Sequence, residues 1–424
     1  MDKREFLMSV GTASLGAVFA SPFGKSLDAM LASAAGRLPA DLASDDAFWT
    51  AMRGKYRLHP ERINFENGYY SMQSEEVLEK FIGRVRAVNL DGSYYMRTRM
   101  AEDRLAVRQR VAALAGCSDD ELVITRNTTE SLDTVIAGYD WKQGDEAVMA
   151  VQDYGAMLDQ FKLQARRYGM VNKTVSLPLD PKSDAEIVDL YANAITSRTR
   201  LLMCCHLVNI SGQILPVRKI AEMAHSKGVD VMVDGAHAFA HLDYRIPELG
   251  ADYYGASMHK WLGAPLGVGI LYVKRDKIAG LWPTFGDSGF ADTDIRKLNH
   301  IGTHPSHTDL AINDAIDFHE AIGVARKEAR LRWLQRYWTD KVRGVPNIQL
   351  NTPTDPTRSC AIANVGIASM RPGDLAKALL EKHRIWTVGI NTANVRGVRI
   401  TPHLYTTTAE LDALVAALTS LAKG

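Results

Sequence analysis

The stretch that decides the fold is "RLLMCCHLVNISGQILPVRKIAEMAHSKGVDVMVDGAH", residues 200–237. It begins with an apolar run that predicts a buried strand, continues with helical spacing of Ile220, Ala221 and Ala224, and ends with a second apolar run. Gly228 marks the end of the helix, since glycine readily adopts the left-handed conformation that follows many helices. A strand, a helix and a strand in this order form a right-handed crossover between parallel strands. The segment therefore predicts an α/β fold.

The same alternation extends on both sides of this segment. From about residue 120 to 275, short apolar runs alternate with helical patterns, which is typical of a mostly parallel sheet between helices. Residues from about 308 to 340 predict one long amphipathic helix, and the later runs "SCAIANVGI", "IWTVGI" and "VRGVRITP" predict strands of a smaller α+β domain. We therefore expect a large domain at residues 71–320 and a linking helix with a small C-terminal domain at 321–424. We expect residues 35–70 to form an N-terminal segment that packs on the small domain.

The composition is that of an ordinary soluble chain with no nucleic-acid footprint. The 424 residues are 46% hydrophobic and 23% charged, and the formal net charge is only +1, so we expect a small-molecule or peptide-like substrate and no nucleic acid. The four cysteines are Cys117, Cys204, Cys205 and Cys360, a pattern that matches neither a disulfide framework nor a zinc site. We expect them to be buried thiols.

The N-terminus has the composition of a secretory signal. "MDKREFLMSVGTASLGAVFASP" combines a charged start, an apolar stretch at residues 7–20 and small residues after it. Its "DKREFLM" resembles the twin-arginine export motif, with Lys3 where the first arginine normally stands. We expect an export signal over residues 1–34, a contact with the export machinery and a periplasmic location, with a cytoplasmic location as the alternative.

Polar residues follow three of the expected strands at the points where the strands end. Asn209, Asp234 and Lys260 each occupy such a position. Because ligands bind at the carboxyl ends of the strands in open parallel sheets, we expect these three residues to meet in one pocket. Upstream, "VITRNTTESLDTVIAGY" predicts a strand, a turn and a helix that begins at Thr128 and Thr129. The free N–H groups of such a helix start bind phosphate readily.

Lys260 lies in the apolar stretch "YYGASMHKWLGAPLGVGILYV", residues 253–273, although lysine is seldom buried. Desolvation lowers the pKa of a lysine amine, and the free amine forms a Schiff base with an aldehyde. A carboxylate such as Asp234 keeps a pyridine nitrogen protonated, and the helix start upstream supplies a cup for phosphate. Together, the lysine, the carboxylate and the phosphate cup predict a site for pyridoxal 5'-phosphate.

These motifs, in this order, resemble those of fold type I pyridoxal phosphate enzymes of the class V aminotransferase family, over roughly residues 60 to 420. The resemblance implies a homodimer with shared active sites, a catalytic role for Lys260, Asp234 and His237, and substrate binding by Arg399 and Asn67. The cofactor-binding residues that it implies are Thr128 and Thr129 in "RNTTES", Tyr154 as the ring-stacking aromatic in "QDYGAM", Asn209 in "HLVN", Asp234 and His237 in "DGAH", Ser257, His259 and Lys260 in "SMHK", and Gly302 and Thr303 in "IGTH". The last pair is implied to reach the phosphate held by the partner subunit.

Within that family, the details "YYMRTRM", "QDYGAM" and "HKWLGAPLG" resemble the isopenicillin N epimerase-like branch. Cysteine desulfurases of the family use a loop cysteine shortly before the carboxylate-binding arginine, because a persulfide needs a thiolate there. The corresponding loop, "TVGINTANVRGVR", contains no cysteine, and Cys360 lies well upstream in a predicted strand. Desulfuration by that route is therefore disfavoured.

The reaction that we expect is chemistry at the α carbon of an amino acid or aminoacyl-peptide substrate, as an aminotransferase or an epimerase. As an alternative, the export signal resembles the arrangement of a periplasmic family member that modifies the glutamyl side chain of pyoverdine siderophores. A metal-dependent enzyme is a further alternative, because imidazole suits zinc, but no close carboxylate pattern accompanies the histidines and we expect no metal. A non-catalytic binding protein would have no need of Lys260 at a strand end. The histidines that a metal site could use are His237, His241, His300, His304 and His307.

Overall fold

A computed structural model describes residues 30–286 and 289–423 of the chain. Of the export signal expected at residues 1–34, residues 1–29 lie outside the described residues. Across the described part of the chain, no helix is both long enough and apolar enough to cross a membrane.

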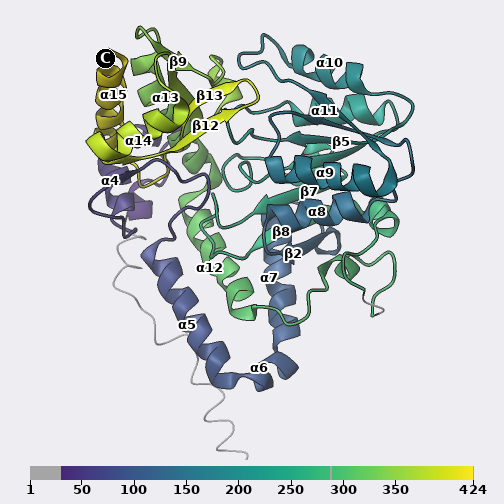
Figure 1. The fold of residues 1–424 in the computed structure, drawn as a ribbon. Coiled ribbons are helices and arrows are strands. Elements are labelled where there is room, and N and C mark those ends of the chain that lie inside the picture. The colour runs from purple at the N-terminus through teal and green to yellow at the C-terminus, as the bar shows by residue number, and fades with distance from the viewer. Residues whose placement is uncertain (1–29, 287–288, 424) are drawn as a thin grey trace, which may run out of the picture.

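A seven-stranded sheet forms the centre of the molecule (Figure 1). In spatial order its strands are β2 (Leu122–Thr125), β8 (Gly269–Val273), β7 (Tyr253–Ser257), β6 (Asp230–Asp234), β5 (Thr199–Cys205), β3 (Glu146–Ala150) and β4 (Val171–Val175). Only β8 runs against its neighbours, and the pairs from β7 through to β4 are parallel. The prediction of an α/β fold with a mostly parallel sheet is confirmed.

Helices cover both faces of this sheet and create two hydrophobic cores. Met232 of β6 belongs to the core that contains Leu132, whereas its neighbour Val231 belongs to the core that contains Ile220. Because successive side chains of a strand point to opposite faces, these two cores lie on opposite sides of the sheet. Helices α8 (Thr128–Gly138) and α9 (Gly155–Tyr168) cover the first face, and α7 (Met100–Ala115), α10 (Asp184–Ala194) and α11 (Val217–His225) contribute to the second.

The N-terminal helices extend the molecule beyond the sheet. Helices α3 (Pro39–Ala43) and α4 (Asp46–Arg53) lie beside the small sheet described below, and α5 (Glu75–Asp91), α6 (Ser93–Thr98) and α7 form an arm that projects away from it (Figure 1). The long helix expected at residues 308 to 340 is wrong, because the structure has two helices, α12 (Ser306–Ile322) and α13 (Val324–Val342). Gly323 separates them with a φ of 87°, which a continuous right-handed helix does not allow.

A four-stranded antiparallel sheet forms the smaller part of the molecule. Its strands, in spatial order, are β12 (Val388–Thr392), β13 (Val395–Ile400), β10 (Ala363–Ile367) and β9 (Ile348–Leu350), and helices α14 (Pro372–His383) and α15 (Thr408–Lys423) accompany them. The strand predicted for "SCAIANVGI" begins only at Ala363, so Cys360 lies before it. The run "IWTVGI" splits into β12 and the short β11 (Ile385–Trp386), which pairs in parallel with β1 (Ile63–Asn64).

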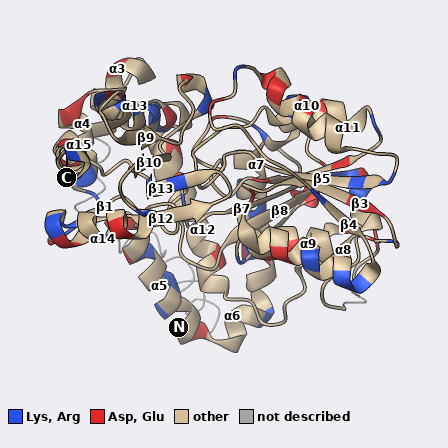
Figure 2. Ribbon diagram, turned by 45° about the horizontal axis from the view of Figure 1, so that its top comes forward, with Lys and Arg blue, Asp and Glu red and all other residues tan. Residues whose placement is uncertain are grey.

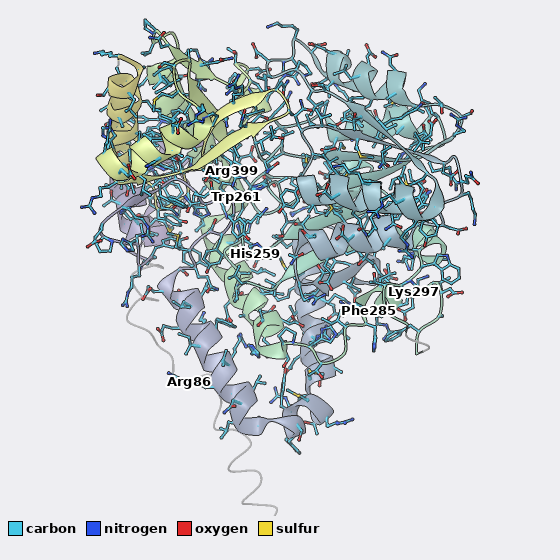
Figure 3. The ribbon with its side chains drawn as sticks, viewed as in Figure 1. Arg86, His259, Trp261, Phe285, Lys297 and Arg399 are labelled. Atoms are coloured by element: carbon cyan, nitrogen blue, oxygen red, sulfur yellow. The ribbon has the colours of Figure 1, made fainter. Side chains whose placement is uncertain are left out.

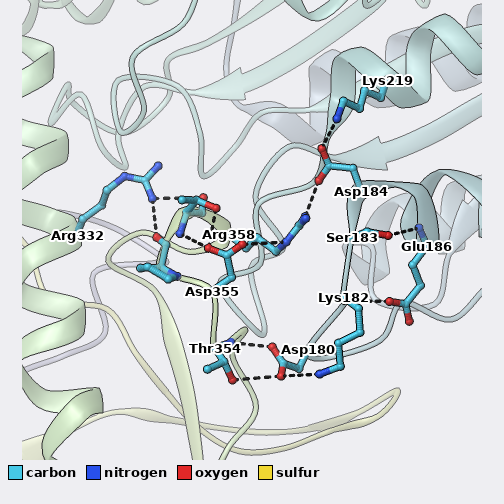
Figure 4. A network of polar contacts seen from close by, with 12 residues as sticks. Asp180, Lys182, Ser183, Asp184, Glu186, Lys219, Arg332, Thr354, Asp355 and Arg358 are labelled. Carbon is cyan, nitrogen blue, oxygen red and sulfur yellow. Dashed lines mark hydrogen bonds and ion pairs between the residues drawn. The ribbon is translucent and has the colours of Figure 1, made fainter.

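Polar contacts tie the two sheets together at one edge (Figure 4). Asp184 of α10 accepts from Lys219 at 2.6 Å and pairs with Arg358 at 2.7 Å, and Thr354 donates to Asp180 at 3.1 Å. Elsewhere, charged residues of both signs are interspersed along the outer helices (Figure 2).

Candidate active site

The carboxyl ends of β5, β6 and β7 lie side by side at the edge that faces the small sheet. Cys205, Asp234 and Gly255 pair in register across these three strands. Asp234 therefore ends its strand next to Asn209, which follows β5, and next to Lys260, which follows β7. The structure brings together the three strand-end residues that the sequence singled out. In Figure 3, Arg399, Trp261 and His259 lie between the two sheets at this edge.

Lys260 points its amine at His237. The Lys260 Nζ lies 3.1 Å from His237 Nε2. Burial lowers the pKa of Lys260 to about 8, although the negative charge of Asp234 opposes this shift. Burial and the positive charges of Lys260 and Arg399 lower the pKa of His237 well below its ordinary value. At neutral pH, His237 is therefore a neutral imidazole, and about a tenth of Lys260 is the nucleophilic free amine, far more than for an ordinary lysine.

Trp261 determines which nitrogen of His237 carries the proton. The indole Nε1 of Trp261 donates to His237 Nδ1 at 3.3 Å. Because an indole N–H only donates, His237 Nδ1 is an acceptor and the proton of the neutral ring lies on Nε2, facing Lys260. The Trp261 ring is held by stacking on His241 at a centroid distance of 3.8 Å and on His403 at 5.4 Å. Sequence reasoning missed this role, since Trp261 reads as one of many apolar residues around Lys260.

Two aspartates are buried behind Lys260. Asp234 accepts a hydrogen bond from the backbone N–H of Ala236 at 2.9 Å, and burial raises its pKa while Lys260 opposes that shift. Asp153, which sequence reasoning missed, accepts from the backbone N–H groups of Ala150 at 2.8 Å and Cys205 at 3.2 Å. Burial raises the pKa of Asp153 to about 7, and the nearby charge of Asp234 contributes to the rise. Asp153 thus links the ends of β3 and β5.

The residues expected to form a phosphate cup lie together where α8 begins. Ser257, the last residue of β7, accepts from the Thr128 backbone N–H at 2.9 Å, and its hydroxyl lies 2.7 Å from that of Thr128. Thr129 lines an adjoining hollow together with Asn127. Among the described residues, His259 Nδ1 is buried with no hydrogen-bond partner, and burial lowers the pKa of His259 to about 4. A helix start, two hydroxyls and an unused imidazole nitrogen fit a phosphate group.

Tyr154 and the Gly302 loop occupy more exposed positions. Tyr154 directly precedes α9 at the carboxyl edge of the sheet, and its side chain is 45% exposed. Gly302 and Thr303 are exposed in the loop before α12, and Gly302 lines a hollow with Arg104 and His304 rather than with Lys260. Within the described part of one chain, the loop that carries Gly302 and Thr303 is therefore separate from the group of residues around Lys260.

Arg399 reaches the site from β13 and forms an ion pair with Glu66, which the sequence analysis did not single out. Its Nη1 donates to the backbone oxygen of Asn209 at 3.3 Å, and its Nε donates to Glu66 Oε2 at 3.3 Å. The Nη2 of Arg399 donates to the other oxygen of Glu66, which makes the ion pair bidentate. Both side chains are only 8% exposed. Sequence reasoning missed Glu66, because nothing local connects residues 333 positions apart.

Asn67 has no side-chain hydrogen-bonding capacity left for a substrate. Its Oδ1 accepts from Asn64 Nδ2 and from the Tyr405 hydroxyl, both at 2.7 Å. Its Nδ2 donates to the Thr401 backbone oxygen at 2.7 Å, and the residue is fully buried. This geometry indicates that Asn67 positions the segment that carries Glu66.

The five histidines considered as metal ligands do not gather in one place. His241 donates to the backbone oxygen of His237 and stacks on Trp261, whereas His300 and His304 line a hollow with Arg104, and His307 stacks on Phe81. In residues 30–286 and 289–423, no group of three or more His, Cys, Asp or Glu residues is arranged to hold a metal ion.

Comparison with known proteins places the chain among pyridoxal phosphate enzymes. The family model described as aminotransferase class-V matches residues 71–414. An isopenicillin N epimerase from Amycolatopsis lactamdurans is 29% identical over 398 residues, covering 88% of this chain and 99% of that protein. A probable cysteine desulfurase from Halalkalibacterium halodurans is 26% identical over 364 residues, covering 81% of this chain and 88% of that protein.

Solved structures share the fold. The apo structure of a cysteine desulfurase from Thermococcus onnurineus NA1 superimposes with a TM-score of 0.79 at 22% identity, covering 92% of this chain and 99% of the other. A structure of C-DES with glycine covalently linked to its pyridoxal phosphate cofactor gives a TM-score of 0.78 at 21% identity, covering 87% of this chain and 98% of the other. The fold is therefore fold type I, and the cofactor expected from the sequence is confirmed at the level of the family. The chain belongs to the class V aminotransferase family of pyridoxal phosphate-dependent enzymes.

Proposed function

We propose that the protein acts at the α carbon of an amino acid or aminoacyl-peptide substrate, as an aminotransferase or an epimerase. The observation that carries this proposal is the amine of Lys260, held 3.1 Å from the neutral imidazole of His237, with its pKa lowered to about 8. An amine with a pKa near neutrality is suited both to bond an aldehyde and to accept a proton.

Each part of the site has a defined task in this proposal. When bound, pyridoxal phosphate supplies an electron sink for the bond that is broken at the α carbon. Thr128, Ser257 and His259 would hold its phosphate, and the carboxylate of Asp234 would keep its ring nitrogen protonated. Lys260 Nζ removes a proton from the α carbon or returns it. His237 would present its Nε2 proton, which faces Lys260, to the ring substituents.

The size of the cavity beside Arg399 supports a bulky substrate. The cavity has a volume of about 880 Å³; it is lined by Arg399, Glu66, Tyr70 and Trp386 among others, and it adjoins the site through Arg399 rather than through Lys260. A free small amino acid would leave most of this space empty, whereas an aminoacyl-peptide would use it. The volume of this cavity, together with the signal-like sequence of residues 1–34, supports the second candidate, modification of the glutamyl side chain of a pyoverdine-type siderophore.

Desulfuration has less support, although cysteine desulfurases are among the relatives. The loop before Arg399 contains no cysteine. Cys360 is fully buried, and burial raises the pKa of its thiol, so it does not supply a thiolate to the site. The other three cysteines are Cys117, which is partly buried, and the buried Cys204 and Cys205.

Exchange of the α proton tests this proposal. In deuterium oxide, an epimerase should place deuterium on the α carbon of an aminoacyl-peptide without forming a keto acid, because Lys260 Nζ removes and returns the proton. An aminotransferase should release a keto acid and leave the cofactor in its amine form. Mass spectrometry and a keto-acid assay distinguish the two. The absence of both signals across a panel of amino acids and aminoacyl-peptides, or release of sulfide from cysteine instead, would contradict the proposal.

We also propose that the active enzyme is a homodimer with shared sites. Gly302 and Thr303 are exposed, and the hollow next to them is lined by Thr129 of the phosphate cup and by the exposed Phe285 (Figure 3). Large exposed apolar side chains beside a functional site are typical of protein interfaces. A second subunit on this surface would cover Phe285 and bring the Gly302 loop to the partner's phosphate cup.

We further propose that the chain is exported to the periplasm by the twin-arginine route, in the folded state. The support is the sequence of residues 1–34 and a cofactor site assembled from the ends of several strands, which an unfolded chain cannot keep loaded. Changing both Lys3 and Arg4 to Gln should leave the loaded protein in the cytoplasm, while the native chain is recovered from the periplasm. Fractionation and N-terminal sequencing measure this. Equal distribution of both forms would refute the targeting proposal and leave the chemistry untouched.

A further inference from the structure

The charge of Arg399 is already compensated inside the protein. Its guanidinium makes two hydrogen bonds to Glu66, and its Nη1 makes one to the backbone of Asn209. Gly68 lies against the guanidinium plane, since a Cβ at this position would be 2.9 Å from Arg399 Cζ. Glu66 and Asn209 therefore hold two edges of the guanidinium group, and Gly68 lies against one of its faces, before any substrate binds.

Three of the five N–H groups of Arg399 are used in this way, which leaves one on Nη1 and one on Nη2. A substrate carboxylate that binds these two N–H groups shares the guanidinium with Glu66. Two carboxylates on one arginine leave a net negative charge in a site where both partners are 8% exposed. Burying an uncompensated charge is unfavourable, so a bare carboxylate binds weakly here.

The Glu66–Arg399 pair lies at the strand edge that carries the reacting centre, because Arg399 Nη1 donates to the backbone oxygen of Asn209, which follows β5 next to the strand that ends in Asp234. The positive charge of Arg399 lowers the pKa of Lys260, and the negative charge of Glu66 raises it. Both residues also line the cavity of about 880 Å³. Because Arg399 and Glu66 are bound to each other, a substrate group that reaches Arg399 at this edge also meets Glu66.

We propose that Glu66 is a specificity-determining residue that selects an amide over a bare carboxylate at the Arg399 position. A carboxamide or a peptide amide places its carbonyl oxygen on the free Arg399 N–H groups and donates its own N–H to Glu66. Such a group is neutral, and it satisfies both members of the pair. The preferred substrate class is an aminoacyl compound whose carboxyl group is amidated. This inference rests on the proposed α-carbon chemistry.

The ratio of affinities for L-alanine and L-alaninamide tests the inference. These two ligands differ only at the carboxyl group, and binding to the cofactor-loaded enzyme is followed by the change in its visible spectrum. Glu66→Gln keeps a hydrogen-bond acceptor for Arg399 and removes the negative charge. The carboxylates of Glu66 and L-alanine, about 5 Å apart at an effective dielectric constant of about 20, would repel each other enough to weaken binding more than about 100-fold. Local relaxation of the side chains reduces the repulsion, so we take about tenfold as the lower bound of the effect. We therefore expect the variant to shift the ratio at least about tenfold toward L-alanine.

Glu61→Gln is the matched control, because Glu61 is an exposed glutamate on the same segment. It should leave the ratio at the wild-type value. An unchanged ratio in Glu66→Gln, or a shift toward L-alaninamide, overturns the role of Glu66 even when both ligands react normally. If neither ligand changes the spectrum of the loaded wild type, the proposed α-carbon chemistry fails, and the inference fails with it.

Discussion

Replacing Lys260 with alanine should abolish turnover and remove the visible absorption band of the loaded enzyme. Lys260 is the amine that the site presents to the cofactor aldehyde, with its Nζ 3.1 Å from His237. Its loss removes both the covalent attachment and the base that handles the α proton, a contribution of about 10²–10⁴-fold from proton transfer alone. Sodium borohydride should fix the cofactor to the wild-type chain and leave the Ala variant unlabelled, as mass spectrometry would show. The Thr128 and Ser257 contacts should still hold cofactor weakly in the variant.

Lys274→Ala provides the control for that experiment, because Lys274 is exposed and pairs with the exposed Asp276 at 3.7 Å. It should keep both the visible band and the activity. Cofactor uptake by the cofactor-free wild type should also become faster as the pH rises through about 8, the value to which burial lowers the pKa of Lys260. The direction follows because only the deprotonated amine attacks an aldehyde. A Lys260→Ala variant that retains the band and turns over would exclude this lysine as the attachment point.

The parts of the fold that the sequence predicted are those controlled by local periodicity. Residues 231–233, just before Asp234, are apolar, and they form the buried middle of β6 at the centre of the sheet, where both faces are covered. The prediction of one long helix after residue 308 was wrong at a single residue. The apolar pattern continues across Gly323, but the backbone of this residue adopts a φ of 87°. Hydrophobic periodicity carries no information about such a turn.

In the candidate site, too, the residues that follow a local sequence pattern could be predicted, and those that depend on distant contacts could not. Asp234 and Lys260 could be predicted because each follows a recognisable strand, and parallel strands bring their ends to one edge. Glu66 could not be predicted, because its partner Arg399 lies 333 positions away and no local pattern links the two. Trp261 was hidden for a different reason. Its stacking partners and its donation to His237 exist only in the folded chain.

Asp234→Asn should lower kcat by about 10²–10⁴-fold while the protein stays folded and keeps its cofactor. The carboxylate at the end of β6 holds the ring nitrogen in its protonated form, and a neutral amide at the same place does not, so the ring becomes a poorer electron sink. Asn still accepts from the backbone N–H of Ala236, which Asp234 contacts at 2.9 Å, so the turn after β6 is retained. The phosphate cup of Thr128 and Ser257 belongs to other strands and does not depend on this charge. Steady-state kinetics, circular dichroism and the visible spectrum measure these three properties, with the exposed Asp243→Asn as a control that should change none of them. An Asn variant with an unchanged kcat would remove Asp234 from the chemistry, and one that folds but loses the cofactor altogether would make it an anchoring residue instead.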